Sequence, residues 1–157
     1  MIVTSRERAM DMVAKPIHIA ASAISTDTWR CTGRGNPLWL GACGQCPKAY
    51  EQAGITDQLN LFELHAFTIM AALSLEACGF AGPGRGWELA RDNAIARNGR
   101  LPSAPSAVSR PVATRGCDWR LSDCQVARQL RGEAGDNQVA NAQTGMAQNL
   151  GAVGRRR

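Results

Sequence analysis

The chain has 157 residues, enough for one domain, and its 45% hydrophobic and 20% charged residues are typical of a globular protein. Its net charge is +5, and Arg155, Arg156 and Arg157 supply three of these charges. No basic stripe with interleaved aromatic residues is present, so the sequence does not indicate nucleic-acid binding. No apolar run reaches the roughly 20 residues that span a bilayer, and the N-terminus lacks the apolar centre of a signal peptide. We expect a cytoplasmic protein without nucleic-acid or membrane partners, whose six cysteines are reduced.

The first half of the chain is expected to alternate between helix and strand. The expected elements are a helix over 5–14, a buried strand over 17–24, a helix over 39–53 and a strand over 60–65. Gly54 is expected to end the helix before it, because glycine adopts the left-handed backbone found at helix C-termini.

The second half continues this alternation. A helix over 67–79 is apolar on nearly every face, which is typical of a helix that is buried on all sides. The remaining expected elements are a polar helix over 86–97, an irregular stretch over 98–119, an amphipathic helix over 121–133 and a strand over 143–150. This order predicts an α/β domain in which helices are layered against a sheet.

Four segments of the chain resemble the thiolases, and among them the sterol-carrier-protein type. They are AYEQAGI at 49–55, FELHAFT at 62–68, QLRGEAGDNQV at 129–139 and GMAQNLGAVG at 145–154. The string at 129–139 is the most specific of the four, and the order and spacing of all four agree with the family. The resemblance covers roughly residues 6–154 and corresponds to the C-terminal half of such an enzyme.

The resemblance implies a thiolase-like C-terminal half, with helices layered against a mixed sheet. Residues 1–16 would be a remnant of the connection between the halves, 17–154 the domain itself, and 155–157 a basic tail. The implied chemistry is acyltransfer: Claisen condensation or thiolytic cleavage of 3-ketoacyl-CoA in lipid or sterol metabolism. The substrate would be a coenzyme A thioester, with no bound cofactor. The partners would be acyl-CoA and either a thiolase N-terminal half or further copies of the chain.

The catalytic groups of the family are only partly represented. His65 matches a histidine that helps to form an oxyanion hole in the family, although a structural histidine is the alternative interpretation. Ala66 replaces the aspartate that follows it in the family, and no cysteine stands beside it. The nucleophilic cysteine and the histidine of the G-H-P loop have no match here, so the isolated chain is expected to be inactive. The resemblance further suggests substrate-binding roles for Gly145, Asn149 and Gly151.

Cys43 and Cys46 form a C-x-x-C pair, a spacing that is found in zinc and redox sites. No second pair or histidine follows at ligand spacing, so we expect no metal. Cys31 and Cys78 are interpreted as small core or surface residues.

The stretch over 107–124 departs from the family at the place where the G-H-P loop should stand. Residues 107–115 can be back-translated with one permitted set of codons. When one base is added in front of these codons and they are read again, they encode Gly-Gly-Leu-Lys-Ala-Arg-Gly-His-Pro. The stretch is therefore interpreted as a frameshifted reading of that loop, and it is expected to be irregular and exposed. The alternatives to an acyltransferase half are a non-catalytic acyl-CoA-binding subunit that pairs with a separate N-terminal chain, or the product of a frameshifted pseudogene.

Overall fold

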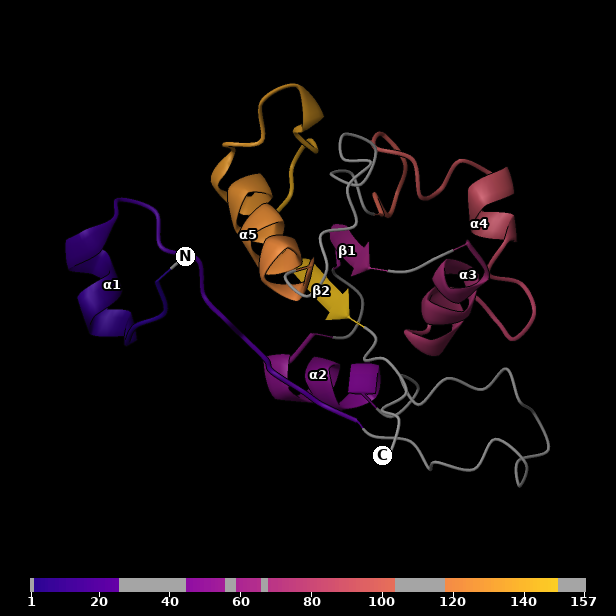
Figure 1. The fold of residues 1–157 in the computed structure, drawn as a ribbon, viewed down its shortest axis with the longest axis horizontal. Helices are drawn as coiled ribbons and strands as arrows, with labels where there is room; N and C mark the ends of the chain where they lie inside the picture. The colour runs from indigo at the N-terminus through magenta and orange to yellow at the C-terminus, as the bar shows by residue number, and fades with distance from the viewer. Residues whose placement is uncertain (1, 26–44, 56–58, 66–67, 104–117, 150–157) are drawn as a thin grey trace, which may run out of the picture.

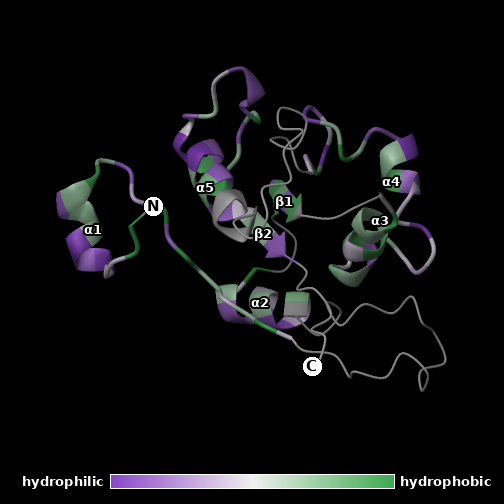
Figure 2. Cartoon of the chain, viewed as in Figure 1, coloured by the Kyte–Doolittle hydropathy of each residue, from purple (hydrophilic) through white to green (hydrophobic). Residues whose placement is uncertain are grey.

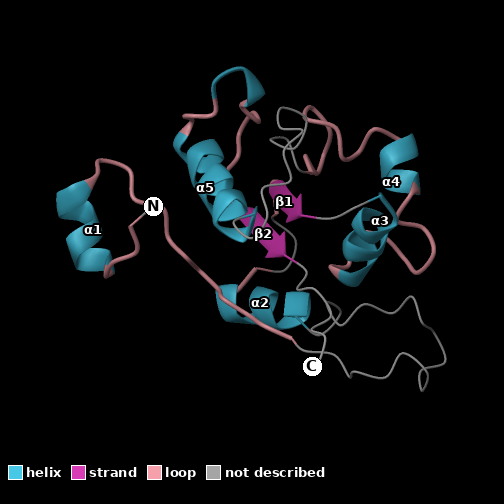
Figure 3. Ribbon diagram, viewed as in Figure 1, coloured by secondary structure: helices cyan, strands magenta, loops and turns pink. Residues whose placement is uncertain are grey.

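The computed structural model describes residues 2–25, 45–55, 59–65, 68–103 and 118–149. The elements are α1 (Arg6–Met12), α2 (Gln45–Ala53), β1 (Leu61–His65), α3 (Thr68–Ala77), α4 (Glu88–Arg91), α5 (Asp118–Arg131), the 3-10 helix η4 (Gly135–Asn137) and β2 (Gly145–Asn149). Figure 3 shows the two short strands surrounded by helices and long connections. None of the helices in these ranges has the length and apolar character that crossing a membrane requires.

The sheet is built on a parallel pair of strands. β1 and β2 run side by side, with Leu61 opposite Gly145 and His65 opposite Asn149. Along the other edge of β1, the N–H of Phe62 donates to the carbonyl oxygen of Pro102 at 2.9 Å, and Phe62 forms a parallel bridge with Ser103. β1 is therefore the inner member of the described sheet. The α/β class is confirmed.

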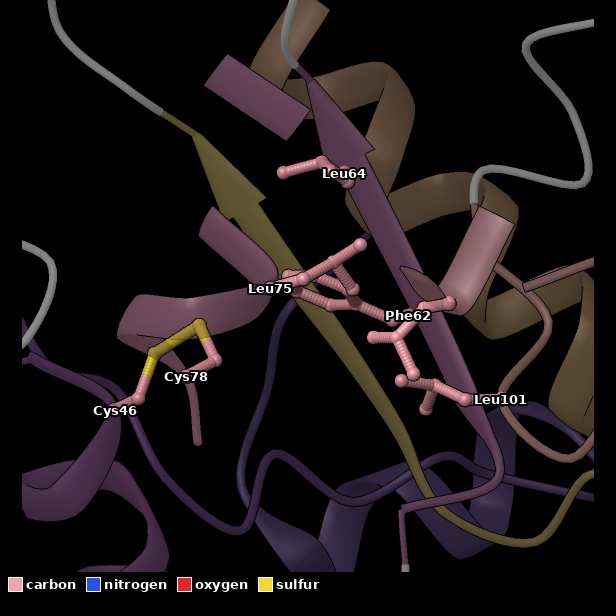
Figure 4. Close-up of a cluster of buried hydrophobic side chains, with 7 residues drawn as sticks. Cys46, Phe62, Leu64, Leu75, Cys78 and Leu101 are labelled. Atoms are coloured by element: carbon pink, nitrogen blue, oxygen red, sulfur yellow. A yellow bond between two sulfur atoms is a disulfide. The ribbon is translucent and has the colours of Figure 1, made fainter. Parts of the chain in front are cut away.

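Helices cover both faces of this sheet, as parallel strands require (Figure 1). On one face, Phe62 and Leu64 pack with Leu75 of α3 and with Leu101 (Figure 4). On the other face, Leu61 packs with Val126 of α5 and with Val139. The alternation of side chains along β1 therefore divides the core into an α3 side and an α5 side.

Most of the predicted elements are confirmed: α1, α3, α5, β1 and β2 lie within or close to the ranges that the sequence favoured. Gly54 ends α2 with a φ of 66°, and the N–H of Ile55 donates to the carbonyl oxygen of Tyr50 at 3.0 Å. This is the hydrogen bond of a Schellman motif, in which a left-handed residue closes the helix.

Three expectations are wrong. Residues 17–24 are in no strand, because an apolar run forms a strand only where a neighbouring strand pairs with it. The helix over 86–97 shortens to Glu88–Arg91, and Asn93 takes a left-handed φ of 53° soon after it ends. Residues 118–124 are the first half of α5 rather than an irregular loop, and Ser122 there is buried.

Residues 107–117 lie outside the described part of the chain. The frameshift interpretation of their codons stays a prediction, and the DNA sequence of the locus would test it.

None of the residues of α1 is buried, and the helix contributes to neither hydrophobic cluster of the described core. Met10 and Met12 are exposed, and Figure 2 shows hydrophilic and hydrophobic residues mixed along this helix. The stretch that follows α1 is held to the domain where Nε of Arg131 donates to the carbonyl oxygen of Lys15 at 3.1 Å.

On α3, Ile69 is 63% exposed, so the expectation that this helix is buried on all sides is not met within the described residues.

A carboxylate orders the loop between α3 and α4. The side chain of Glu76 accepts a hydrogen bond from the N–H of Gly84 at 3.0 Å and another from the N–H of Gly86 at 2.8 Å. The loop is drawn so close to α3 that a Cβ on Gly86 would lie 2.3 Å from the carbonyl oxygen of Ala72 and 2.9 Å from Oε1 of Glu76. Only a residue without a side chain fits at this position.

Replacing Gly86 by alanine should therefore lower the free energy of unfolding by about 1–3 kcal/mol, the usual cost of overpacking. Urea denaturation measures the change. Gly82→Ala in the same loop is the matched control, because its Cβ would meet only the Cδ of Arg85 at 3.9 Å. An equal free energy of unfolding for Gly86→Ala and Gly82→Ala would show that the loop can move away from α3 and make room for the added Cβ.

Candidate functional site

The carboxyl ends of β1 and β2 are the place where the fold favours a ligand. Ligands of open α/β sheets bind beyond the carboxyl ends of parallel strands. β1 ends at His65 and β2 ends at Asn149, and these two residues are paired in the sheet. Figure 2 shows that β2 becomes hydrophilic toward its tip. The backbone therefore brings two polar residue types together at one end of the sheet.

An open pocket of about 380 Å³ lies beside this end of β2. Its wall is formed by three segments that are distant in the sequence: the extended stretch after α1, the first half of α5, and the end of β2. The lining residues are Ser22, Ala23, Ile24, Ser122, Asp123, Ala147, Gln148 and Asn149. Most of the lining side chains that carry polar atoms come from α5 and β2.

Asn149 is the polar side chain at the end of β2 that faces this pocket. Side chains alternate along the strand, and Ala147 packs on the α5 side of the sheet. Asn149, two residues later, therefore points to the same side, where Asp123 of α5 also lines the pocket. Gln148 points to the opposite side; it is only 2% exposed, and neither its Nε2 nor its Oε1 has a hydrogen-bond partner among the described residues.

Two carboxyl groups on the α5 side of the sheet are shifted toward their neutral forms. Burial raises the pKa of Glu63 to about 7, and Oε2 of this residue has no partner in the described chain. Partial burial likewise raises the pKa of Asp123, which lines the pocket. Shifted pKa values of this kind are frequent at functional sites, although buried structural groups also show them.

A second hollow of about 520 Å³ lies at the end of α2, lined by Tyr50, Glu51, Gly54 and Ile55. The hydroxyl of Tyr50 already donates to the carbonyl oxygen of Cys78 at 3.0 Å. None of these lining residues belongs to β1 or β2, so we place the site at the strand ends.

Comparison with known families decides what this domain is. Residues 23–157 match the family described as thiolase C-terminal domain-like. The chain belongs to this family.

Relatives agree with this assignment. An acetyl-CoA acetyltransferase of Methanothermobacter thermautotrophicus is 29% identical over 161 residues, which cover 98% of this chain and 41% of the relative. Human sterol carrier protein 2 is 32% identical over 114 residues, covering 68% of this chain and 20% of the relative. This thiolase domain therefore spans less than half the length of either.

A solved structure supports the fold. The chain matches the structure titled Ltp2-ChsH2(DUF35) aldolase with a TM-score of 0.65 and 18% identity, over 74% of this chain and 30% of that one. At this identity the likeness concerns the fold alone.

Within this thiolase domain, the residues suggested by the sequence occupy different places. His65 and Asn149 are neighbours at the strand ends, and of these only Asn149 has a described side chain, which lines the pocket. Gly145 begins β2, four residues before Asn149, or roughly 13 Å at about 3.3 Å per residue. There a Cβ would lie 2.8 Å from Cγ1 of Val126, so the glycine lets α5 approach the sheet. Gly151 lies outside the described residues.

The most specific string of the thiolase domain, at 129–139, has a structural role. Gln129 is 1% exposed; its Nε2 donates to the carbonyl oxygen of Asn137, and its Oε1 accepts from the N–H of Val139, both at 2.8 Å. Nε2 of Gln138 donates in return to the carbonyl oxygen of Gln129 at 2.9 Å. These bonds fold the segment after α5 back toward β2, and none of the three reaches the pocket.

The sequence missed two features of the thiolase domain. Nothing in the pattern marked Gln148 or Glu63 as buried, because strand residues with polar side chains are usually assigned to an exposed face. The cysteines also differ from expectation: Cys46 and Cys78 form a disulfide instead of remaining reduced, and their Cα atoms lie 5.2 Å apart, within the usual range. Cys43 lies outside the described residues, and among those described no three potential ligands converge on a metal site.

Proposed function

We propose that this thiolase domain binds an acyl-CoA thioester in the pocket at the ends of β1 and β2, and contributes to Claisen condensation or thiolytic cleavage of 3-ketoacyl-CoA. The observation that carries the proposal is the side chain of Asn149, which lines a pocket at the strand ends of a thiolase-family domain. A coenzyme A thioester carries amide and carbonyl groups along its length. These groups could form hydrogen bonds with the side-chain amide of Asn149.

In this proposal the chain supplies binding and positioning, and the nucleophile comes from elsewhere. Among the described cysteines, Cys46 and Cys78 are joined to each other, and Cys124 is free but does not line the pocket. A thiolate near the thioester carbon is needed for acyl transfer, and it would come from a thiolase N-terminal half. The exposed Ile69 on α3 and the exposed Met10 and Met12 on α1 favour such a partner.

The first expected result is the absence of turnover. The purified chain should show no thiolysis of acetoacetyl-CoA above background, because no described thiol faces the pocket. The assay follows loss of the 3-ketoacyl-CoA absorbance with and without a thiol alkylator. Turnover that the alkylator abolishes would show that one of the six cysteines is a nucleophile and would contradict the proposal.

Binding is tested separately, by calorimetry with coenzyme A and acetoacetyl-CoA. Asn149→Leu keeps the side-chain volume but removes both polar atoms, so we expect affinity to fall about tenfold, the equivalent of roughly one good hydrogen bond. Gln143→Leu, at an exposed position shortly before β2, is the control. Unchanged affinity in Asn149→Leu would show that the ligand binds elsewhere.

A further inference from the structure

A buried cysteine pair connects α2 with the end of α3. Cys46 belongs to the first turn of α2, and Cys78 follows the last residue of α3 (Figure 4). The pair is joined across 32 positions of sequence, and the two residues are 1% and 3% exposed. Both belong to the cluster that Phe62 and Leu75 form on the α3 side of the sheet.

The attachment of α2 to the core is concentrated at this point. Cys46 and Tyr50 are four residues apart, so they share one face of α2, and both pack on the same cluster. The hydroxyl of Tyr50 donates to the carbonyl oxygen of Cys78 at 3.0 Å, directly beside the covalent bond. The position of α2 therefore depends strongly on Cys78.

α2 in turn holds the stretch that forms one wall of the pocket. Oε1 of Gln52, near the end of α2, accepts a hydrogen bond from the N–H of Ser22 at 3.0 Å. Ser22, Ala23 and Ile24 line the pocket opposite the end of β2. A continuous path of contacts thus runs from the Cys46–Cys78 bond through α2 and Gln52 to the pocket wall.

We propose that Cys46 and Cys78 form a redox switch that fixes the Ser22–Ile24 wall of the pocket when they are oxidised and releases it when they are reduced. Closing the bond removes two protons and two electrons from the two thiols. A disulfide oxidant such as glutathione disulfide accepts them and becomes two molecules of thiol. Because both sulfur atoms are buried, exchange requires α2 to move off the core, which is the same motion that loosens the wall. The inference rests on the proposed function only for the identity of the ligand.

The covalent step is tested by peptide mapping. Protein incubated with glutathione disulfide, or with a phosphine reductant, is alkylated under denaturing conditions and digested with trypsin. Cleavage after Arg34, Lys48 and Arg85 places Cys46 on peptide 35–48 and Cys78 on peptide 49–85. We expect these two peptides to be linked after oxidation in the wild type and in the controls Cys43→Ser and Cys124→Ser, but not in Cys78→Ser. A Cys43–Cys46 bond within the first peptide, or free thiols throughout, would overturn the proposal.

The coupling is tested by hydrogen exchange of the amides in residues 19–25, which needs no ligand. We expect exchange at Ser22 to be about tenfold slower in the oxidised protein, because opening of α2 is then opposed by a cross-link. Gln52→Leu should still form the disulfide but lose this dependence on oxidation. Reduction of the wild type gives the same comparison if Cys78→Ser does not fold. Equal exchange in both redox states would refute the switch.

Calorimetry with coenzyme A then separates this inference from the proposed function. Affinity that differs at least threefold between the oxidised and reduced protein supports the switch acting on the pocket. Equal affinity in both states would show that the redox state of the cysteine pair does not affect the ligand site. If neither state binds, the proposed function fails, while mapping and exchange still decide whether the Cys46–Cys78 bond controls the wall.

Discussion

Replacing Gln129 by leucine is expected to lower the free energy of unfolding by about 3 kcal/mol. The substitution removes both polar atoms and keeps the volume. It leaves the N–H of Val139, in a residue that is 3% exposed, and the carbonyl oxygen of Asn137 without their partners. An unpaired buried backbone group costs about 1–3 kcal/mol, and the two losses occur together. The segment that carries the chain from α5 toward β2 would then lose its anchor.

Urea denaturation followed by circular dichroism measures this change. The control is Gln143→Leu, the same substitution at an exposed position on the same connection, where we expect a change within about 0.5 kcal/mol. A loss below about 1 kcal/mol in Gln129→Leu would show that water replaces both hydrogen bonds, and that the string at 129–139 is not held by this glutamine.

Glu63 should make the domain less stable as the pH rises. Its side chain is 6% exposed, and burial raises its pKa from 4.5 to about 7 in the folded protein. The folded state therefore binds the proton more tightly than the unfolded state does. The stabilisation is fully present below pH 4.5 and is lost as the pH rises to and beyond 7. The full difference amounts to about 3 kcal/mol.

The measurement is the free energy of unfolding between pH 4.5 and 8, for the wild type and for Glu63→Gln. Asp123 also has a raised pKa and contributes in the same direction, so the difference between the two proteins isolates Glu63. Glutamine cannot lose a proton, so the variant should lack this part of the pH dependence and be the more stable protein at pH 8. Parallel curves would mean that water or a counter-charge reaches Glu63.

The sequence predicted the elements whose apolar pattern is sufficient on its own. α3 is a long apolar run, α5 is amphipathic, and Gly54 ends α2 through a backbone conformation that glycine favours. The strand expected over 17–24 failed because strand pairing is decided by distant segments rather than by local pattern.

The candidate site was predictable only in part. The resemblance indicated His65 and Asn149, and the register of β1 with β2 places them side by side. The burial of Glu63 and Gln148 was not predictable, because a polar residue in a strand is buried only when a helix from another part of the chain covers its face. The pairing of Cys46 with Cys78 depends in the same way on where α2 and α3 pack.

The arrangement of α1 has a practical consequence. A seven-residue helix without a buried side chain gains little stability from packing, and isolated helices shorter than about 12–15 residues are marginal in water. This end of the domain should therefore melt first on heating, well before the sheet. A fusion partner or an immobilisation tag placed before Ser5 would accordingly leave the core and the pocket untouched.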